Sequence, residues 1–427
     1  MSRSPQLLIL KLSILLFLPK TFFGQVSEGL DLTKLSKLND YIEEQVKAEK
    51  LAGAEILIAR NNKIIIHSSR GFSNLETKKK LDKNSIYFIQ SMTKPIISVA
   101  IMQLYERGMI DLEDKVSKYI PEVANLEVAL DLSQGINSDT EKVKSPITIG
   151  HLLSHTSGFS HGFGLVKSTK LDKDVGKLIY GKKYPITKSL DDGTNYFIHS
   201  TLESRITALI SAPLVHQPGE KWHYGGGIDL LALIIQKVSK QSIPTYLTEN
   251  IFLPLGMNET GYNIDEKDLD RVMSVHKLNW SYELTPGKNQ PPRTGNTLYG
   301  GTHGLYSTAL DYFKFCQMIL NHGKFNGLSI LKKKTVDLMK INQVGMSYPR
   351  NNQGFGYGFA IEYDEFSSEE EKAQSLYWGG YFNTRFFIDL KRNIVAIWMT
   401  QKLPNLSYGG YHQVLKKNVY DAIIDIE

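Results

Sequence analysis

Cysteine is almost absent from this chain, which has a single one, Cys316, among 427 residues. An intrachain disulfide is therefore impossible. The apolar stretch 312–320 around Cys316 predicts a buried thiol and not a reactive one. An excess of one charge sign is also missing, because the net charge is only +6. Short basic runs at 78–80 and 332–334 are typical of solvated helix or loop edges, so we expect no nucleic-acid partner.

Cofactor motifs are missing as well. The sequence contains no phosphate-binding glycine-rich loop, no dinucleotide fingerprint and no Cys/His zinc signature. His151 and His155 stand four residues apart on an expected helix, but no third ligand accompanies them. We interpret this pair as packing and capping residues, and we expect neither a metal nor a cofactor.

Only one long apolar run occurs, and it lies near the N-terminus. Arg3 precedes this run, which covers residues 7–18 and is too short to span a bilayer in the mature chain. We expect residues 1–24 to be a signal peptide cleaved after Gly24, giving a secreted or periplasmic protein without a stable membrane span. A retained N-terminal anchor is the alternative.

The rest of the chain, 30–427, is expected to be one α/β domain in which an antiparallel sheet built from both termini is flanked by helices. A mainly helical subdomain is expected within it, over about 121–264. Periodicity predicts helices at 32–50, 91–106 and 411–426, and strands at 54–59, 63–67, 354–363, 384–390 and 393–400. Asn61 and Asn62 form a hairpin turn signal between the first two strands.

The most informative motif is the Ser-x-x-Lys sequence from Ser91 to Lys94, which opens the helix predicted at 91–106. A spacing of three places the serine hydroxyl and the lysine amine on one helix face. A helix N-terminus favours developing negative charge, and a desolvated lysine could take the serine proton. Taken alone, the motif also fits an N-capped helix with a surface lysine.

Three later blocks accompany this motif, at 147–158, 217–224 and 304–312. Together with Ser91 and Lys94, they resemble the serine β-lactamase and penicillin-binding-protein family, in the family's order and over most of the chain. The motifs are most similar to those of the β-lactamase-like (family VIII) carboxylesterases. The resemblance implies a β-lactamase/transpeptidase-like fold and a serine hydrolase that forms an acyl-enzyme on Ser91.

The same resemblance implies a proton-handling tyrosine in a Tyr-x-Asn motif, and position assigns it to Tyr224. Here the asparagine is replaced by Gly226, which has no side chain to hold a substrate amide or brace the lysine. A literal Tyr-x-Asn begins at Tyr381, but it lies in the wrong part of the chain.

The family's third motif, usually Lys-Thr-Gly, maps to Trp378, Gly379 and Gly380 as substrate-binding residues. By this match, the backbone N–H groups of Ser91 and Tyr381 form an oxyanion hole. Trp378 offers an apolar face where a lysine would bind a carboxylate, so the match points toward small esters and away from β-lactams.

Other interpretations stay open. The Gly-x-Ser-x-Gly sequence at 158–162, with Ser160 at its centre, could mark a nucleophile elbow, but its context predicts a loop. With Arg385 as the carboxylate contact, the same chemistry could serve a D-amino-acid peptidase, a D-Ala-D-Ala carboxypeptidase or a β-lactamase acting on an amide. A non-catalytic penicillin-binding-like protein is the remaining alternative. The oligomeric state is not predicted.

Overall fold

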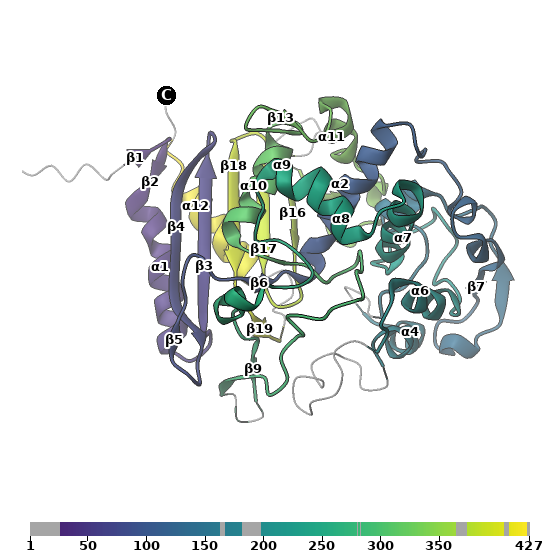
Figure 1. Cartoon of the computed structure of the whole chain (residues 1–427), viewed down its shortest axis with the longest axis horizontal. Coiled ribbons are helices and arrows are strands. Elements are labelled where there is room, and N and C mark those ends of the chain that lie inside the picture. Colours follow the sequence, from purple (N-terminus) through teal and green to yellow (C-terminus); the bar gives the residue numbers. More distant parts are fainter. Residues whose placement is uncertain are drawn as a thin grey trace, which may run out of the picture.

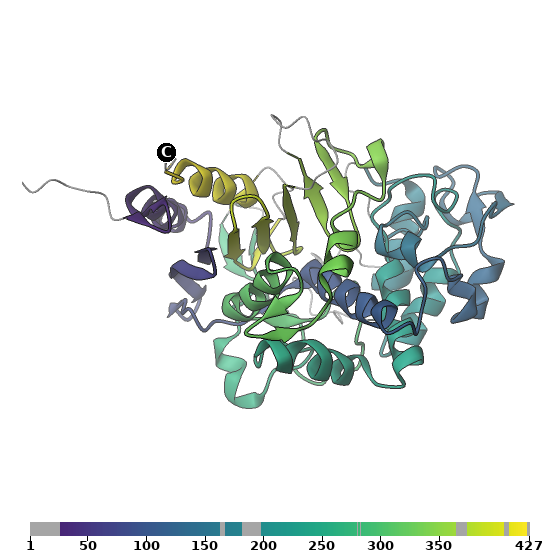
Figure 2. The same cartoon turned by 90° about the horizontal axis from the view of Figure 1, so that it is seen from above.

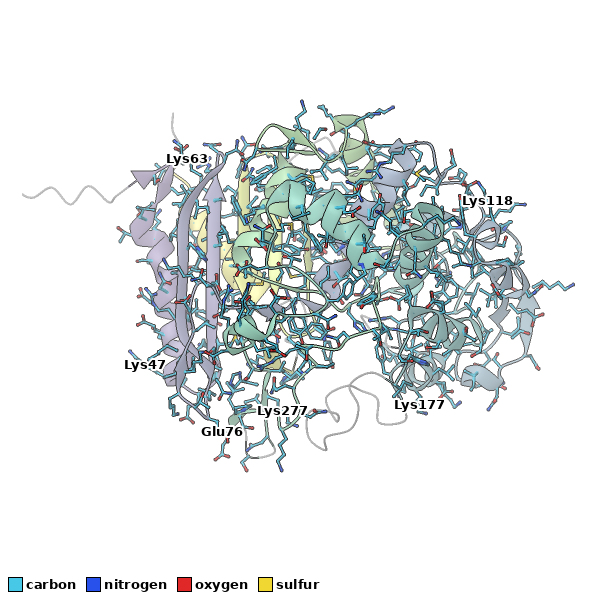
Figure 3. All side chains as sticks on the ribbon, viewed as in Figure 1. Lys47, Lys63, Glu76, Lys118, Lys177 and Lys277 are labelled. Atoms are coloured by element: carbon cyan, nitrogen blue, oxygen red, sulfur yellow. The ribbon has the colours of Figure 1, made fainter. Side chains whose placement is uncertain are left out.

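The computed structural model describes residues 26–162, 167–181, 198–279, 281, 283–363, 374–404 and 410–424. The predicted signal peptide, 1–24, lies outside the described residues. Among the residues described, none of the helices combines the length and the apolarity needed to cross a bilayer. The labelled lysines Lys47, Lys63, Lys118, Lys177 and Lys277 lie at separate places around the outline of the molecule in Figure 3.

The centre of the fold is an eight-stranded antiparallel sheet to which both ends of the described chain contribute (Figure 1). A hairpin turn with positive φ at Asn61 (51°) and Asn62 (67°) joins its two N-terminal strands, as predicted. In sheet order the strands are β14 (Gln353–Phe355), β15 (Ala360–Glu362), β16 (Ser375–Gly379), β17 (Arg385–Asp389), β18 (Ile394–Met399), β3 (Gly53–Arg60), β4 (Lys63–Asn74) and β5 (Lys79–Lys80).

The pairing of β18 with β3 joins the two ends of the sequence, since Ile394 lies opposite Arg60 and Met399 opposite Glu55. Both strands are almost completely buried because helices cover both faces of the sheet. The helices α1 (Leu32–Lys47) and α12 (Tyr411–Asp421) pack together on one face, and α10 (Ala309–Leu320) packs on the other (Figure 2). The predicted sheet from both termini, flanked by helices, is confirmed.

Beside the sheet lies a part made mainly of helices, which occupies the right of Figure 1. It is attached through α2 (Thr93–Glu106), which packs against α7. Two short paired strands, β7 (Glu127–Ala129) and β8 (Thr140–Lys142), also belong to this part. Its helices are α3 (Ile149–Leu153), α4 (Lys170–Tyr180), α6 (Leu202–Ile210), α7 (Gly227–Ser239) and α8 (Ile243–Leu247).

Two predictions about the C-terminal strands are wrong. The single strand expected at 354–363 is the pair β14 and β15, because Gly358 (φ 90°) supports a tight turn between them, where an added Cβ would lie 2.5 Å from the Cβ of Ser98. The prediction also missed β16, the strand that carries Trp378 and Gly379.

Candidate active site

Ser91 lies in a 3-10 turn, Gln90–Met92, directly before α2. The predicted helix therefore begins two residues later than expected, at Thr93. Gln90 has a positive φ of 50°, which is unusual for a side-chain-bearing residue and marks a strained turn beside Ser91. Ser91 is partly exposed, whereas the residues of α2 that follow it are buried as far as Leu104. The chain thus presents one accessible hydroxyl at the end of a buried helix.

Lys94 lies one turn further along, with its Nζ 3.2 Å from the Oγ of Ser91. Its ammonium also donates to the carbonyl oxygen of Thr302 at 2.8 Å. Burial lowers the pKa of Lys94 well below its usual value, and the charge of Arg205 lowers it further against the opposing effect of Asp229. A lysine with so low a pKa can accept a proton from a neighbouring hydroxyl.

Tyr224 approaches the same hydroxyl from the segment before α7. Its phenolic OH donates to the Oγ of Ser91 at 2.8 Å, and the Nζ of Lys94 lies 4.6 Å from the centre of its ring. The structure therefore brings the three predicted catalytic side chains, which come from two distant parts of the sequence, to one point.

The end of β16 lies against the turn that carries Ser91. A Cβ added to Gly380 would lie only 2.4 Å from the carbonyl oxygen of Ile89, so the two backbones touch where a side chain has no room. The predicted oxyanion-hole residue Tyr381 follows directly. Trp378 lies on the site side of β16, with its ring centre 5.4 Å from that of Tyr224.

Comparison with known proteins identifies the family to which the chain belongs. The sequence model of the Beta-lactamase family matches residues 38–420. The chain belongs to the beta-lactamase family. This membership, together with relatives named as esterases, makes it a serine hydrolase, and the predicted α/β fold class is confirmed.

The chain is similar to proteins of two bacteria and to a solved structure. Protein Rv1367c of Mycobacterium tuberculosis is 26% identical over 380 residues, which cover 86% of this chain and 90% of the relative. Esterase EstB of Burkholderia gladioli is 22% identical over 414 residues, which cover 92% and 96%. The structure of EstCE1, described as a hydrolase with promiscuous acyltransferase activity, superimposes with a TM-score of 0.72 at 23% identity, covering 91% of this chain and 99% of that one.

Gly226 departs from the beta-lactamase family's Tyr-x-Asn motif and is closely packed by its neighbours. A Cβ at Gly226 would lie 3.0 Å from Cδ2 of Leu209 and 3.3 Å from the carbonyl oxygen of Ser160. A side chain at this position would therefore require Leu209 to shift by a few tenths of an ångström. The carbonyl of Thr302 contacts Lys94 in its place, a contact that the sequence motifs did not indicate.

The predicted residue Trp378 belongs to an aromatic wall that extends from Tyr224, and the other members, Trp222, Tyr348 and Phe355, were missed by the sequence motifs. Its ring centres lie 4.8 Å apart for Trp222 and Tyr348, and 5.4 Å apart for Phe355 and Trp378. All four side chains are buried. The wall makes the surroundings of the site apolar, and Tyr224 lies at the edge of the wall.

A buried polar network behind Lys94 was also missed. The carboxylate of Asp229 pairs with Arg205, with Oδ2 3.0 Å from Nε. Arg205 contacts Nε2 of His303 at 2.8 Å and donates to the hydroxyl of Tyr180 at 3.1 Å. The one available signal was that Asp229 is the only acidic residue in the apolar helix α7.

The residues of the alternative motifs, Ser160, His151 and His155, have structural contacts instead. Ser160 lies in a loop and donates to Oδ1 of Asp172 at 2.6 Å, so it does not form a strand-to-helix elbow. The Nδ1 of His151 accepts the N–H of Thr148 in a capping box, and His155 lies after the end of α3, where its ring packs 5.0 Å from that of Tyr224.

Arg385 does not lie where a substrate carboxylate would need it. Alternate residues of a strand point to opposite faces, and Phe386 is the one paired with Trp378, so Arg385 belongs to the face that α12 covers. Its Nη1 donates to the carbonyl oxygens of Gly380 and Thr384, at 2.9 and 2.8 Å. The expected carboxylate contact is therefore wrong, and Arg385 braces the turn between β16 and β17.

Proposed function

We propose that this chain is a carboxylesterase that hydrolyses small esters through an acyl-enzyme on Ser91. One observation carries the proposal: the Oγ of Ser91 lies within hydrogen-bond distance of both Tyr224 and Lys94, and Lys94 is buried. A serine hydroxyl is a weak nucleophile until a neighbouring base removes its proton. A desolvated lysine and a phenol in contact with the same oxygen can supply that base.

The reaction follows from these contacts. Neutral Lys94 takes the hydroxyl proton as the Oγ of Ser91 bonds to the ester carbonyl carbon. The proton then passes through the Lys94–Tyr224 pair to the alcohol oxygen as the ester C–O bond breaks. Water attacks the acyl carbon in the second half, gives one proton to the same pair, and Ser91 regains its proton as the carboxylic acid leaves.

The backbone N–H groups of Ser91 and Tyr381 are proposed as the oxyanion hole for both tetrahedral intermediates. Support comes from the close approach of Gly380 to the backbone of Ile89, which holds the turn after β16 beside Ser91. Two donors in a fixed position stabilise developing charge without reorganising during the reaction.

An ester with apolar groups fits the surroundings best. By the motif match, Trp378 takes the position of the family's carboxylate-binding lysine, and the aromatic wall continues beyond it. Arg385 is on the other face of the sheet and holds backbone carbonyls, which argues against D-peptides and penicillins as preferred substrates. The similar proteins EstB and EstCE1 are named as an esterase and a hydrolase.

Hydrolysis of p-nitrophenyl butyrate by the purified protein tests the proposal. We expect activity that falls by about four orders of magnitude or more in Ser91→Ala. Ser160→Ala is the matched control, because it removes the serine of the rival motif and should leave most of the activity. Loss of activity in Ser160→Ala alone would contradict the assignment. Activity toward penicillin or D-alanyl dipeptides, with none toward the ester, would replace the substrate class.

We also propose that the mature protein is secreted or periplasmic and that residues 1–24 are removed. The apolar run at 7–18 behind Arg3 supports this proposal. Intact-mass measurement of protein recovered from the extracellular or periplasmic fraction should give a chain beginning at Gln25. A full-length mass in the membrane fraction would instead indicate a retained anchor.

A further inference from the structure

The contact that holds Lys94 depends on a residue that does not touch it. The carbonyl of Thr302 accepts from the Nζ of Lys94 at 2.8 Å, and the N–H of the same residue donates to Oδ1 of Asp229 at 2.7 Å. The carboxylate thus fixes Thr302 from its N–H side, while the lysine binds its carbonyl oxygen. Side-chain motion at Asp229 would move the carbonyl that holds Lys94.

The second oxygen of this carboxylate belongs to an ion pair. Oδ2 of Asp229 lies 3.0 Å from Nε of Arg205, and both side chains are only 2% exposed. An isolated charge in such a place would be costly, so each member compensates the charge of the other. Arg205 is held in turn by His303 and Tyr180. The pair therefore forms a rigid, overall neutral unit behind the lysine.

Few charges face Lys94 within the described part of the chain. Burial lowers the pKa of each nearby histidine well below its usual value, so these rings are uncharged at neutral pH. The charges that act on Lys94 are then the carboxylate of Asp229 and the guanidinium of Arg205. The titratable groups around the lysine are Tyr224, His155, His161, His303, Asp229 and Arg205.

We propose that Asp229 is a positioning residue for Lys94, which fixes the Thr302 carbonyl that holds the lysine and balances the charge of Arg205 behind it. This inference rests on the proposed function, because it assigns Lys94 as the base for Ser91. The Asp229–Thr302 pair takes the bracing role that the asparagine has in the family motif, since Gly226 has no side chain to supply it.

Removing either charge of the pair should move the basicity of Lys94, in opposite directions. Asp229→Asn keeps an oxygen for the N–H of Thr302 but leaves Arg205 as an unbalanced positive charge. The protonated lysine is then disfavoured, so the acid limb of the pH profile should move down by about one pH unit. Arg205→Gln leaves the carboxylate alone, favours the protonated lysine, and should move the limb up by about the same amount.

The readout is the second-order rate of covalent labelling by a fluorophosphonate between pH 5 and pH 10, which needs no natural substrate. Both variants lose the same ion pair, so damage to packing alone would shift both profiles the same way or leave both unmoved. The double variant Asp229→Asn/Arg205→Gln should return the limb close to that of the parent. Far-UV circular dichroism checks that each variant is folded, and if one is not, the direction of the other decides.

Asp311→Asn is the control, because Asp311 is also buried and ion-paired, with Lys314 at 2.8 Å, and its carboxylate accepts from Thr260 and the N–H of Glu259 instead of from Thr302. It should leave the pH profile unchanged. A parent that is labelled while both folded variants keep its acid limb would overturn the role of Asp229 only. A parent that is not labelled, or is labelled equally in Ser91→Ala, would overturn the proposed function itself.

Discussion

At the scale of single residues, the turn after β16 requires a glycine, because a side chain at position 380 would collide with its neighbours. A Cβ at Gly380 would lie 2.3 Å from Oγ1 of Thr384 and 2.4 Å from the carbonyl oxygen of Ile89. The backbone must retreat from Ser91 to accommodate a methyl group. In Gly380→Ala we therefore expect the Tyr381 N–H to leave the proposed oxyanion hole and kcat for p-nitrophenyl butyrate to fall by about 10²- to 10³-fold.

The matched control for this prediction is Gly261→Ala. The nearest atom to a Cβ at Gly261 is 3.5 Å away, which is ordinary contact, and its φ is not in the left-handed region. Its kcat should stay close to that of the parent. A Gly380→Ala enzyme with parental kcat would show that the turn after β16 supplies no donor to the reaction.

The residues of the site differ in how far the sequence could predict them. Ser91 and Lys94 are three apart on one helix face, so a local motif was enough to pair them. Asp229 and Arg205 lie on different helices, and nothing local relates them. A carboxylate inside an apolar helix predicts that a buried partner compensates its charge, but the sequence does not identify that partner.

At the scale of elements, α12 is fixed to the sheet through Glu362 on β15. Lys416 of α12 lies 2.5 Å from its Oε2, and His412 lies nearby. Burial alone would raise the pKa of Glu362, but the nearby His412 side chain and the charge of Lys416 outweigh it and lower the pKa to about 2. The stabilisation is thus complete above the usual pKa of about 4.5 and is lost as the pH falls toward 2.

Glu362→Gln should therefore lower the free energy of unfolding at pH 7 by about 2–3 kcal/mol and have little effect near pH 2. Urea unfolding followed by circular dichroism at several pH values measures this difference. Glu266→Gln, on an exposed 3-10 turn, is the control and should change little at any pH. A loss that is equally large at pH 2 would indicate a packing defect and not an ionic contact.

Strand prediction succeeded where the pattern was long and failed where the chain turns tightly. β3 has eight residues and β4 has twelve, and Asn61 and Asn62 mark the turn between them, although the prediction ended the second strand at 67 and the structure continues it to Asn74. β14 and β15 have three residues each, and the glycines between them hide a turn inside one apparent strand. β16 carries Trp378 yet has only five residues, all but one of them buried, so alternation could not reveal it.

At the scale of the whole molecule, the candidate site joins the two parts of the fold. Ser91 and Lys94 come from the start of α2, Tyr224 comes from the helical part, and Trp378 comes from the sheet. α2 packs against α7, and β16 packs against the turn of Ser91. The sheet in turn needs both ends of the chain, because β18 pairs with β3.

This arrangement predicts that the protein unfolds as one cooperative unit. Separation of the helical part from the sheet would expose α2, which is buried along most of its length, and would remove Tyr224 from Ser91. Esterase activity, far-UV circular dichroism and tryptophan fluorescence should therefore be lost at the same urea concentration. The chain has four tryptophans, so a variant that keeps only Trp398, in the sheet core, and a variant that keeps only Trp222, in the aromatic wall, report on the two places separately. Activity lost well before the fluorescence of Trp398 would mean that the helical part detaches first and that the two parts are separate folding units.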